Sequence, residues 1–352
     1  MNRPKLLHRR TVRWLAVMLI AFGVVLLLWL KGPNWSQVGQ AFTNVSWQWV
    51  LVALLLNILS VLTRVLCWWT ILRPALAMPG LRYLDALSAF AAGLIANAVL
   101  PGRGGEIARV AVLHHKLEAR PGLWPTLIGT VIAYRLLDVV PVVVLAVWVI
   151  FTAPLPSWAF TSLITVVAIG AALFLAGVAL AHRVNPRRPV RLGPLRRAAV
   201  YTEQGLAALN SLRTGAQAAA LQLLGWFIQL LAVWTAMRAF QIYLPLSAAG
   251  LVLVLMNIAL LLPLWTGNIG LLQAAIALPL IGYGVSYAQG FAYGIGLQAI
   301  EASVGIGFGL GFLAKEGIGL ATLREARRAA ARESPAGHSP ARRVGVRHFP
   351  RS

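Results

Sequence analysis

The stretch Asn97–Arg109, NAVLPGRGGEIAR, interrupts a strongly hydrophobic sequence with one proline, three glycines and the charged residues Arg103, Glu106 and Arg109. A related break occurs at Asn257–Gln273, NIALLLPLWTGNIGLLQ. Backbone N–H and C=O groups that such a break frees inside lipid cost several kcal/mol each, unless protein or water satisfies them. Two breaks at matching places in a membrane chain are typical of the substrate path in secondary transporters.

The composition places this chain in a membrane. Of its 352 residues, 59% are hydrophobic and 11% are charged, whereas soluble proteins carry roughly 25% charged residues. The net charge is +22. Most basic residues fall in loops predicted on one side of the membrane, which indicates the positive-inside pattern rather than nucleic-acid binding. The single cysteine, Cys67, excludes an intramolecular disulfide.

Apolar runs of roughly 20 residues predict spanning helices. Six are clear, at 14–31, 49–70, 124–152, 158–181, 216–240 and 287–313. Two interrupted apolar hairpins lie between them, at 82–117 and 246–283. The first run lacks a small-residue cleavage site and is interpreted as a retained helix. The prediction is an all-α polytopic membrane protein with six spanning helices and two broken re-entrant hairpins, or eight helices if both hairpins cross fully.

The positions of Lys and Arg orient these helices. The basic N-terminus 1–13, the loop 182–215 and the tail 314–352 are expected in the cytoplasm, as for a protein of the bacterial inner membrane. The segments 31–48 and 238–247 carry one basic residue each and are expected outside. The tail is rich in Arg, Ala, Ser and Pro, and we expect it to be mostly disordered.

An internal repeat follows from the spacing of the breaks. Pro101 and Pro263 lie 162 residues apart, and this shift carries the helix 124–152 onto the last predicted helix. The first half begins outside and the second begins inside, so the charges predict an inverted-topology repeat, the plan of many secondary transporters. The transmembrane domain 14–313 then holds repeat halves at about 49–152 and 216–313.

The charges at the first break form a candidate anion site. If the chain is helical after Gly105, Glu106 and Arg109 share one face of that helix. Arg103 lies on the glycine-rich turn, near the free N–H groups of the new helix, and this combination suits a phosphate-like group. The alternative is a cytoplasmic loop whose arginines and glutamate pair with each other, and the sequence leaves both interpretations open.

Three further charges lie within predicted helices. Arg135 and Asp138 would each cost roughly 2.5–3.5 kcal/mol at mid-membrane, and pairing offsets part of this. They are interpreted either as a packing ion pair or as a wall of the substrate path that anchors the first hairpin. Glu301 stands alone, one residue from the position onto which Asp138 shifts. It is interpreted as a proton or headgroup site with Arg64 as candidate counter-ion, or as a protonated packing residue.

The first break and the helix after it resemble the transmembrane domain of lysylphosphatidylglycerol synthases, which also occurs alone in bacterial and archaeal flippase-like proteins. The resemblance covers about residues 10–315. In the first half it is carried by Asn97, Leu100, Pro101, Gly102, Arg103, Gly105, Glu106, Arg109, Arg135 and Asp138. The family's second-half pattern, Gly-Gly-Leu-Gly-x-x-Glu, corresponds here to Gly267-Asn268-Ile269-Gly270-Leu-Leu-Gln273. Tyr134 and Gln273 stand where the family often has acids.

Taken together, these observations give one set of candidate substrate- or headgroup-binding residues. They are Asn97, Pro101, Gly102, Arg103, Gly105, Glu106, Arg109, Arg135, Asp138, Gly267, Asn268, Gly270, Gln273 and Glu301. The synthases carry a soluble aminoacyl-transfer domain, whereas only a short basic tail follows Ala314 here. The resemblance therefore implies the lipid-moving part alone, acting on a phospholipid, glycolipid, polyprenyl-linked lipid or hopanoid.

The leading hypothesis is a non-enzymatic lipid translocase whose partners are membrane lipids, with an anionic or polyprenyl-linked headgroup. The sequence contains no catalytic Ser/His/Asp set, metal cluster or phosphate-binding loop, so no cofactor, metal or nucleic acid is predicted. His114 and His115 are only weak metal candidates, because adjacent positions on a helix diverge. One rival is an enzyme of lipid headgroups with Glu106 and Asp138 as acid and base. Another is a non-catalytic partner of cell-envelope lipid biosynthetic enzymes.

Overall fold

The computed structural model describes residues 33–78, 80–99, 104–117, 122–154, 157–183, 211–261 and 268–316. The predicted first span at 14–31, most of the loop 182–215 and the tail beyond residue 316 lie outside these ranges.

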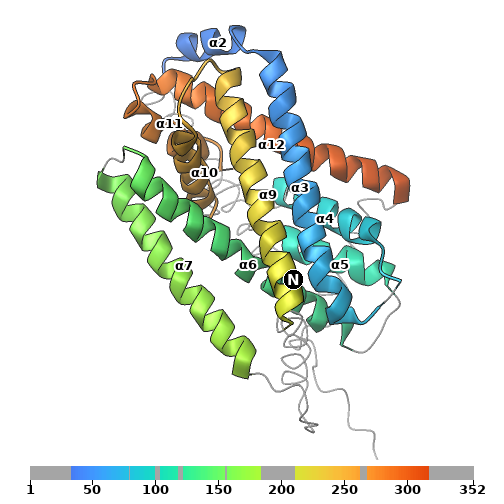
Figure 1. Ribbon diagram of the computed structural model, residues 1–352. Coiled ribbons are helices and arrows are strands. Elements are labelled where there is room, and N and C mark those ends of the chain that lie inside the picture. The colour runs from blue at the N-terminus through green and yellow to red at the C-terminus, as the bar shows by residue number, and fades with distance from the viewer. Residues whose placement is uncertain are drawn as a thin grey trace, which may run out of the picture.

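Every regular element in the described ranges is helical, and no strand occurs in them. This confirms the all-α prediction. The α-helices, drawn in Figure 1, are α2 (Trp35–Thr43), α3 (Trp47–Leu76), α4 (Tyr83–Val99), α5 (Gly105–Lys116), α6 (Leu123–Thr152), α7 (Ser157–Arg183), α9 (Leu212–Ala239), α10 (Leu246–Leu261), α11 (Leu271–Ile281) and α12 (Tyr287–Glu316).

Four of these helices, α3, α6, α9 and α12, are long and apolar enough to cross a membrane. They coincide with the spans predicted at 49–70, 124–152, 216–240 and 287–313. A helix of 30 residues, the length of α3 and α6, extends about 45 Å, more than the roughly 30 Å of a hydrocarbon core. The helix α7 covers another predicted span, at 158–181. The chain is therefore a polytopic membrane protein.

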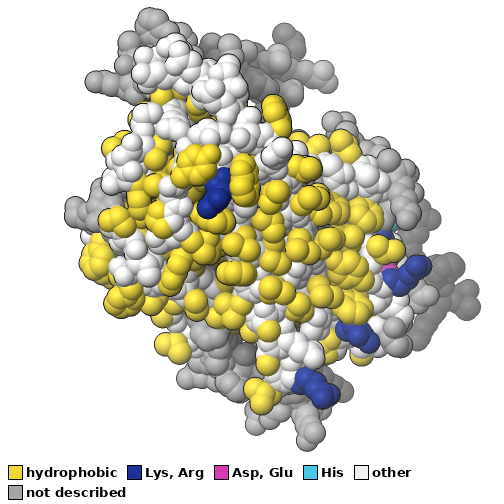
Figure 2. All heavy atoms as spheres, turned by 45° about the horizontal axis from the view of Figure 1, so that its top comes forward, with side chains coloured by type: hydrophobic (Ala, Val, Ile, Leu, Met, Phe, Trp, Pro, Cys, Tyr) yellow, Lys and Arg dark blue, Asp and Glu magenta, His cyan; other side chains and the backbone are white. Residues whose placement is uncertain are grey.

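The outer surface of the bundle is apolar. Hydrophobic side chains dominate the face drawn in Figure 2, with only isolated Lys and Arg side chains among them. On α3, Leu51, Leu55 and Leu59 are exposed one turn apart, and Ile128 and Ile132 repeat this pattern on α6. Soluble proteins rarely expose continuous apolar patches, so this surface suits lipid rather than water.

The helices α3 and α9 form an antiparallel pair at the centre of the bundle, blue and yellow in Figure 1. Three bonds set their register. The Ser46 N–H donates to the Ala239 carbonyl (2.9 Å), the Ser60 hydroxyl to the Gly225 carbonyl (2.8 Å), and the Cys67 thiol to the Ala218 carbonyl (3.2 Å). Residue numbers rise on α3 as they fall on α9, so the two helices point in opposite directions.

Two pairs of short helices occupy the predicted broken hairpins. The helices α4 and α5 lie within 82–117, and α10 and α11 lie within 246–283. With 12 and 11 residues, α5 and α11 are only about 17 Å long. The helix α4 packs against α12, while α10 packs against α6. Each short pair therefore contacts a long helix from the other half of the chain.

The order of helix lengths repeats along the chain. The helices α3 to α6 have 30, 17, 12 and 30 residues, and α9 to α12 have 28, 16, 11 and 30. The buried apolar side chains form two clusters, one centred on α3–α5 and the other on α9–α12. The two series thus each have a core of their own.

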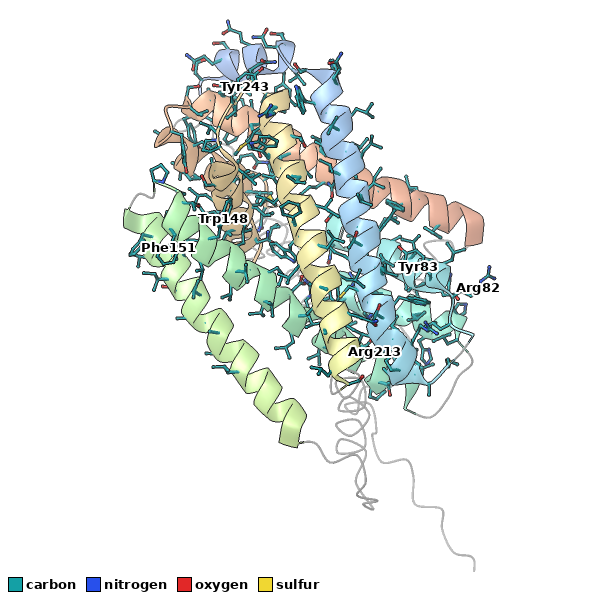
Figure 3. All side chains as sticks on the ribbon, viewed as in Figure 1. Arg82, Tyr83, Trp148, Phe151, Arg213 and Tyr243 are labelled. Carbon is teal, nitrogen blue, oxygen red and sulfur yellow. The ribbon has the colours of Figure 1, made fainter. Side chains whose placement is uncertain are left out.

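The two ends of the bundle differ in their side chains. In Figure 3, Arg82 and Arg213 lie at the end where α3 finishes and α9 begins, whereas Tyr243 lies at the opposite end. The short pair α4–α5 lies toward the end with the arginines, and α11 lies near α2 at the end with Tyr243. The two short pairs are therefore placed toward opposite ends of α3 and α9.

The helix α2 was not anticipated within the predicted outer segment 31–48. It lies across one end of the bundle in Figure 1. The Trp35 ring packs edge-on against Phe291 of α12 (5.9 Å between ring centroids), and Phe42 packs against Phe240 (5.4 Å). Apolar residues at helical spacing after the N-cap Asn34 are the sequence signal that could have indicated this helix.

Candidate functional site

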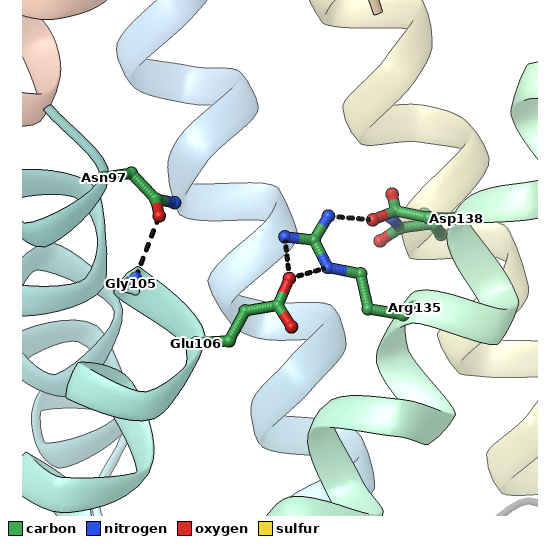
Figure 4. Close-up of polar contacts among 6 residues, drawn as sticks. Asn97, Gly105, Glu106, Arg135 and Asp138 are labelled. Atoms are coloured by element: carbon green, nitrogen blue, oxygen red, sulfur yellow. Dashed lines mark hydrogen bonds and ion pairs between the residues drawn. The ribbon is translucent and has the colours of Figure 1, made fainter. Parts of the chain in front are cut away.

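Arg135 on α6 joins α6 to the first short helix pair, as Figure 4 shows. Its Nε and Nη2 atoms each lie 2.6 Å from Oε1 of Glu106, in the first turn of α5. Its Nη1 atom lies 3.1 Å from Oδ2 of Asp138, one turn further along α6. One guanidinium thus holds two carboxylates from different helices, which fixes α5 against α6.

The sequence anticipated part of this arrangement. The helix after Gly105 is present, and Arg135 and Asp138 pair as their spacing suggested. Glu106 pairs with Arg135 of α6, a partner outside its own break, and Arg103 lies outside the described residues. The partners lie 29 residues apart in the chain, and no local periodicity relates them.

Asp138 is fully provided with hydrogen-bond donors. Besides Arg135, it accepts a bond at Oδ1 from the Trp226 indole N–H (3.0 Å) and one from the Gln222 amide, both on α9. A carboxylate inside a membrane is costly unless cations or donors surround it. Asp138 therefore ties α6 to α9.

Arg109 is buried in a box of aromatic rings. Its guanidinium carbon lies 3.7 Å from the ring centroid of Phe90 (α4), 5.2 Å from Trp68 (α3) and 5.6 Å from Tyr134 (α6). The residue is 3% exposed, and its Nε and Nη1 find no hydrogen-bond acceptor. The ring faces stabilise the cation in place of water. Among the described residues, Arg109 therefore packs against aromatic rings from three helices.

The start of α5 lies unusually close to α4. The Gly105 N–H donates to the Asn97 side-chain oxygen (2.9 Å). A Cβ atom added to Gly105 would lie 2.2 Å from the Gly93 carbonyl oxygen, so only glycine fits there. The three other break residues predicted to contact substrate, Pro101, Gly102 and Arg103, lie outside the described residues.

The second break is polar, but its described residues carry no charge. The Gln273 side chain accepts from the Gly270 N–H (2.6 Å) and donates to Gln298 of α12. The Asn268 amide donates to the Ala259 carbonyl of α10 (3.1 Å). Asn268 and Gln273 are 4% and 2% exposed, so both hold the start of α11 in place. Gly267 lies outside the described residues.

Glu301 is placed differently from the other two carboxylates. It accepts one hydrogen bond, from the Gln229 amide of α9 (2.9 Å). Arg64 of α3 lies near enough to act on it electrostatically, although no direct ion pair joins the two. The Arg64 guanidinium instead lies over the Trp226 ring, 5.0 Å from its centroid.

Sequence reasoning missed the α9 residues Gln222, Trp226 and Gln229. They follow one another at intervals of four and three, so they line one face of α9. Polar side chains at helical spacing in an otherwise apolar span were the available signal. The aromatic box around Arg109 had no such signal, because Trp68, Phe90 and Tyr134 come from three separate helices.

Comparison with known proteins gives one family. The family model described as the lysylphosphatidylglycerol synthase TM region matches residues 13–309. No curated protein matches the chain.

Proposed function

We propose, from the premise that this chain belongs to the family of the lysylphosphatidylglycerol synthase TM region, that it moves a lipid across the membrane. The cargo would be a phospholipid, glycolipid, polyprenyl-linked lipid or hopanoid. We place the protein in a bacterial inner membrane with both termini in the cytoplasm. Its family relates it to lipid modification or translocation, and the arrangement of its helices favours translocation.

We propose further that the two series of helices form an inverted-topology repeat. The shift of 162 residues carries the first residue of α4 to position 245 and that of α6 to 285, and α10 and α12 begin at 246 and 287. The helices α3 and α9, which begin the two series, point in opposite directions. Opposed repeats with broken helix pairs between them are typical of transporters that alternate access to a central site.

The observation that carries the proposal is the ion pair of Arg135 with Glu106. The side chains of these residues are 41% and 33% exposed, whereas that of Asp138 is 14% exposed. A half-exposed guanidinium beside the first break can exchange the Glu106 carboxylate for a lipid phosphate, which it binds with the same two-pronged geometry. Exchange would free α5 from α6 while Asp138 keeps Arg135 in place.

The same contacts argue for a protein without catalysis. An acid–base pair needs carboxylates that gain and lose protons during the reaction. Glu106 and Asp138 both bond to Arg135, and Asp138 accepts two further hydrogen bonds. Both carboxylates are thus engaged by the Arg135 guanidinium, which suits the positioning of helices and not proton transfer.

Reconstitution of the full chain in liposomes with labelled lipids tests the proposal. We expect lipid movement above that of empty vesicles, and a loss of about tenfold or more in Arg103→Ala or Arg135→Lys, which lack a forked phosphate contact. Arg82→Ala is the matched control, because Arg82 is an exposed arginine before the start of α4. No movement of any of the main lipid classes, or full activity in both variants, would contradict the proposal.

A further inference from the structure

Three carboxylates inside the bundle differ in how their charge is compensated. Glu106 receives two bonds from Arg135, and Asp138 receives one from Arg135 together with two from α9. From the described residues, Glu301 receives a single bond, donated by the neutral amide of Gln229. Of the three, Glu301 is therefore the carboxylate for which taking up a proton loses the least stabilisation.

The polar face of α9 connects Glu301 with Asp138. Gln222 and Trp226 bond to Asp138, and Gln229, one turn further, bonds to Glu301. Arg64 lies beside this face, over the ring of Trp226, and its buried Nε has no hydrogen-bond acceptor. An arginine whose Nε has no acceptor thus lies within electrostatic reach of Glu301.

The shift of 162 residues shows how the surroundings of Asp138 and Glu301 differ. It carries Asp138 to position 300, next to Glu301, but it carries Arg135 to Leu297. Leu297 is buried and cannot compensate a charge. The same shift carries Arg64 to Trp226. Asp138 in the first half therefore pairs with an arginine on its own helix. Glu301 in the second half is influenced by an arginine on another helix, Arg64 on α3.

We propose that Glu301 is a proton-binding site that couples lipid movement to a proton gradient across the membrane, with Arg64 as its electrostatic partner. This inference rests on the proposed lipid translocation. A proton delivered by water forms an O–H bond with the Glu301 carboxylate and removes its negative charge. The positive charge of Arg64 is then uncompensated and attracts an anionic headgroup. Release of the proton to the other side restores the first state.

The place of Glu301 on α12 connects it to the first short helix pair. Gly305 and Gly309 follow it at intervals of four residues, on the same side of the helix. These glycines contact Leu94 and Ile95 of α4. Small residues let helices approach closely, and the Ile95 side chain occupies the space beside Gly309. In the proposed coupling, a charge change at Glu301 reaches the pair α4–α5 through this contact.

The surroundings of Glu301 contain few other groups that titrate. The helix α12 packs against α2, α3, α4, α9 and α11. Arg64 is the charged side chain described on these helices that acts on Glu301. The neutral Gln229 amide donates a hydrogen bond to the Glu301 carboxylate. Tyr293, two turns earlier on α12, also senses the charge of Glu301 and donates its hydroxyl to the Val233 carbonyl.

Lipid movement by the full chain in vesicles with an imposed pH gradient tests the coupling. The probe is labelled phosphatidylglycerol, followed in both directions. For one proton per lipid, each pH unit of gradient should change the ratio of the two directions by up to about tenfold. Glu301→Gln keeps an acceptor for Gln229 and should still move lipid, but with a ratio that does not respond to the gradient. Asp85→Asn, a change at the start of α4, should respond like the unaltered protein.

Infrared difference spectroscopy gives a second readout that needs no transport. Acidification should produce C=O bands of protonated carboxylic acids in the unaltered protein, and Glu301→Gln should lack the band that belongs to Glu301. Lipid movement that ignores the gradient overturns the coupling and leaves the proposed function standing, as does an unchanged gradient response in Glu301→Gln. No lipid movement by the unaltered protein overturns both proposals. If Glu301→Gln shows the same C=O bands as the unaltered protein, Glu301 is not the proton site.

Discussion

The buried Arg109 guanidinium contacts the faces of three aromatic rings instead of water. A cation–π contact is worth about 0.5–2 kcal/mol, with the larger values for desolvated sites. Phe90 is the nearest ring, at 3.7 Å. We predict that Phe90→Leu and Arg109→Met are not additive. Chemical unfolding in detergent should give a coupling free energy of about 1–2 kcal/mol between them. Strict additivity would show that the box is apolar packing without a charge-dependent part.

Individual contacts could be predicted only where the partners are neighbours on one helix. The spacing of Arg135 and Asp138 indicated their pairing, and three residues on a helix place two side chains on one face. The bond from Trp226 to Asp138 joins residues 88 apart, so it depends on how α6 and α9 pack. The aromatic box needs the positions of four helices at once, and periodicity along one helix contains no such information.

The close approach of α4 and α5 depends on Gly105. Adding a methyl group there forces a contact with the Gly93 carbonyl and the Asn97 side chain. We predict that Gly105→Ala destabilises the protein by about 1–3 kcal/mol, the usual result of overpacking, and lowers its melting temperature in detergent. Gly307→Ala on α12 is the matched control, because a Cβ there meets nothing within 4 Å. Equal melting temperatures for the two variants would mean that the helices separate freely.

Helices could be predicted from the sequence more completely than their ends. Apolar length identified α3, α6, α9 and α12, because a span must bury its backbone polar groups in its own hydrogen bonds. The helix α9 begins at Leu212, four residues before the predicted span. The helix α2 was missed, because nine residues in a polar outer segment lie below the length that signals a span. Its stability comes from packing on Phe291 and Phe240.

At the scale of the whole chain, the two short helix pairs are either re-entrant or cross the membrane fully. Charge topology alone cannot distinguish these plans, since both return α5 to the side where α4 began. The lengths differ, however. A helix of 12 residues, the length of α5, covers about 18 Å, too short for a core of about 30 Å. We therefore expect residue 104, just before α5, to lie inside the membrane.

Cysteine labelling measures that position directly. Cys67 is buried and is replaced by alanine to give a background without thiols. In that background we predict that Gly104→Cys resists a membrane-impermeant maleimide added outside, while Ser36→Cys on α2 and Tyr243→Cys react readily. The φ angle of −62° at Gly104 accepts any residue, so the substitution itself adds no backbone strain. Outside labelling of residue 104 as fast as that of residue 243 would mean that the first short pair crosses the membrane completely. In that case α4 and α5 would form a complete crossing, and release of α5 from Arg135 could no longer open a path for the headgroup.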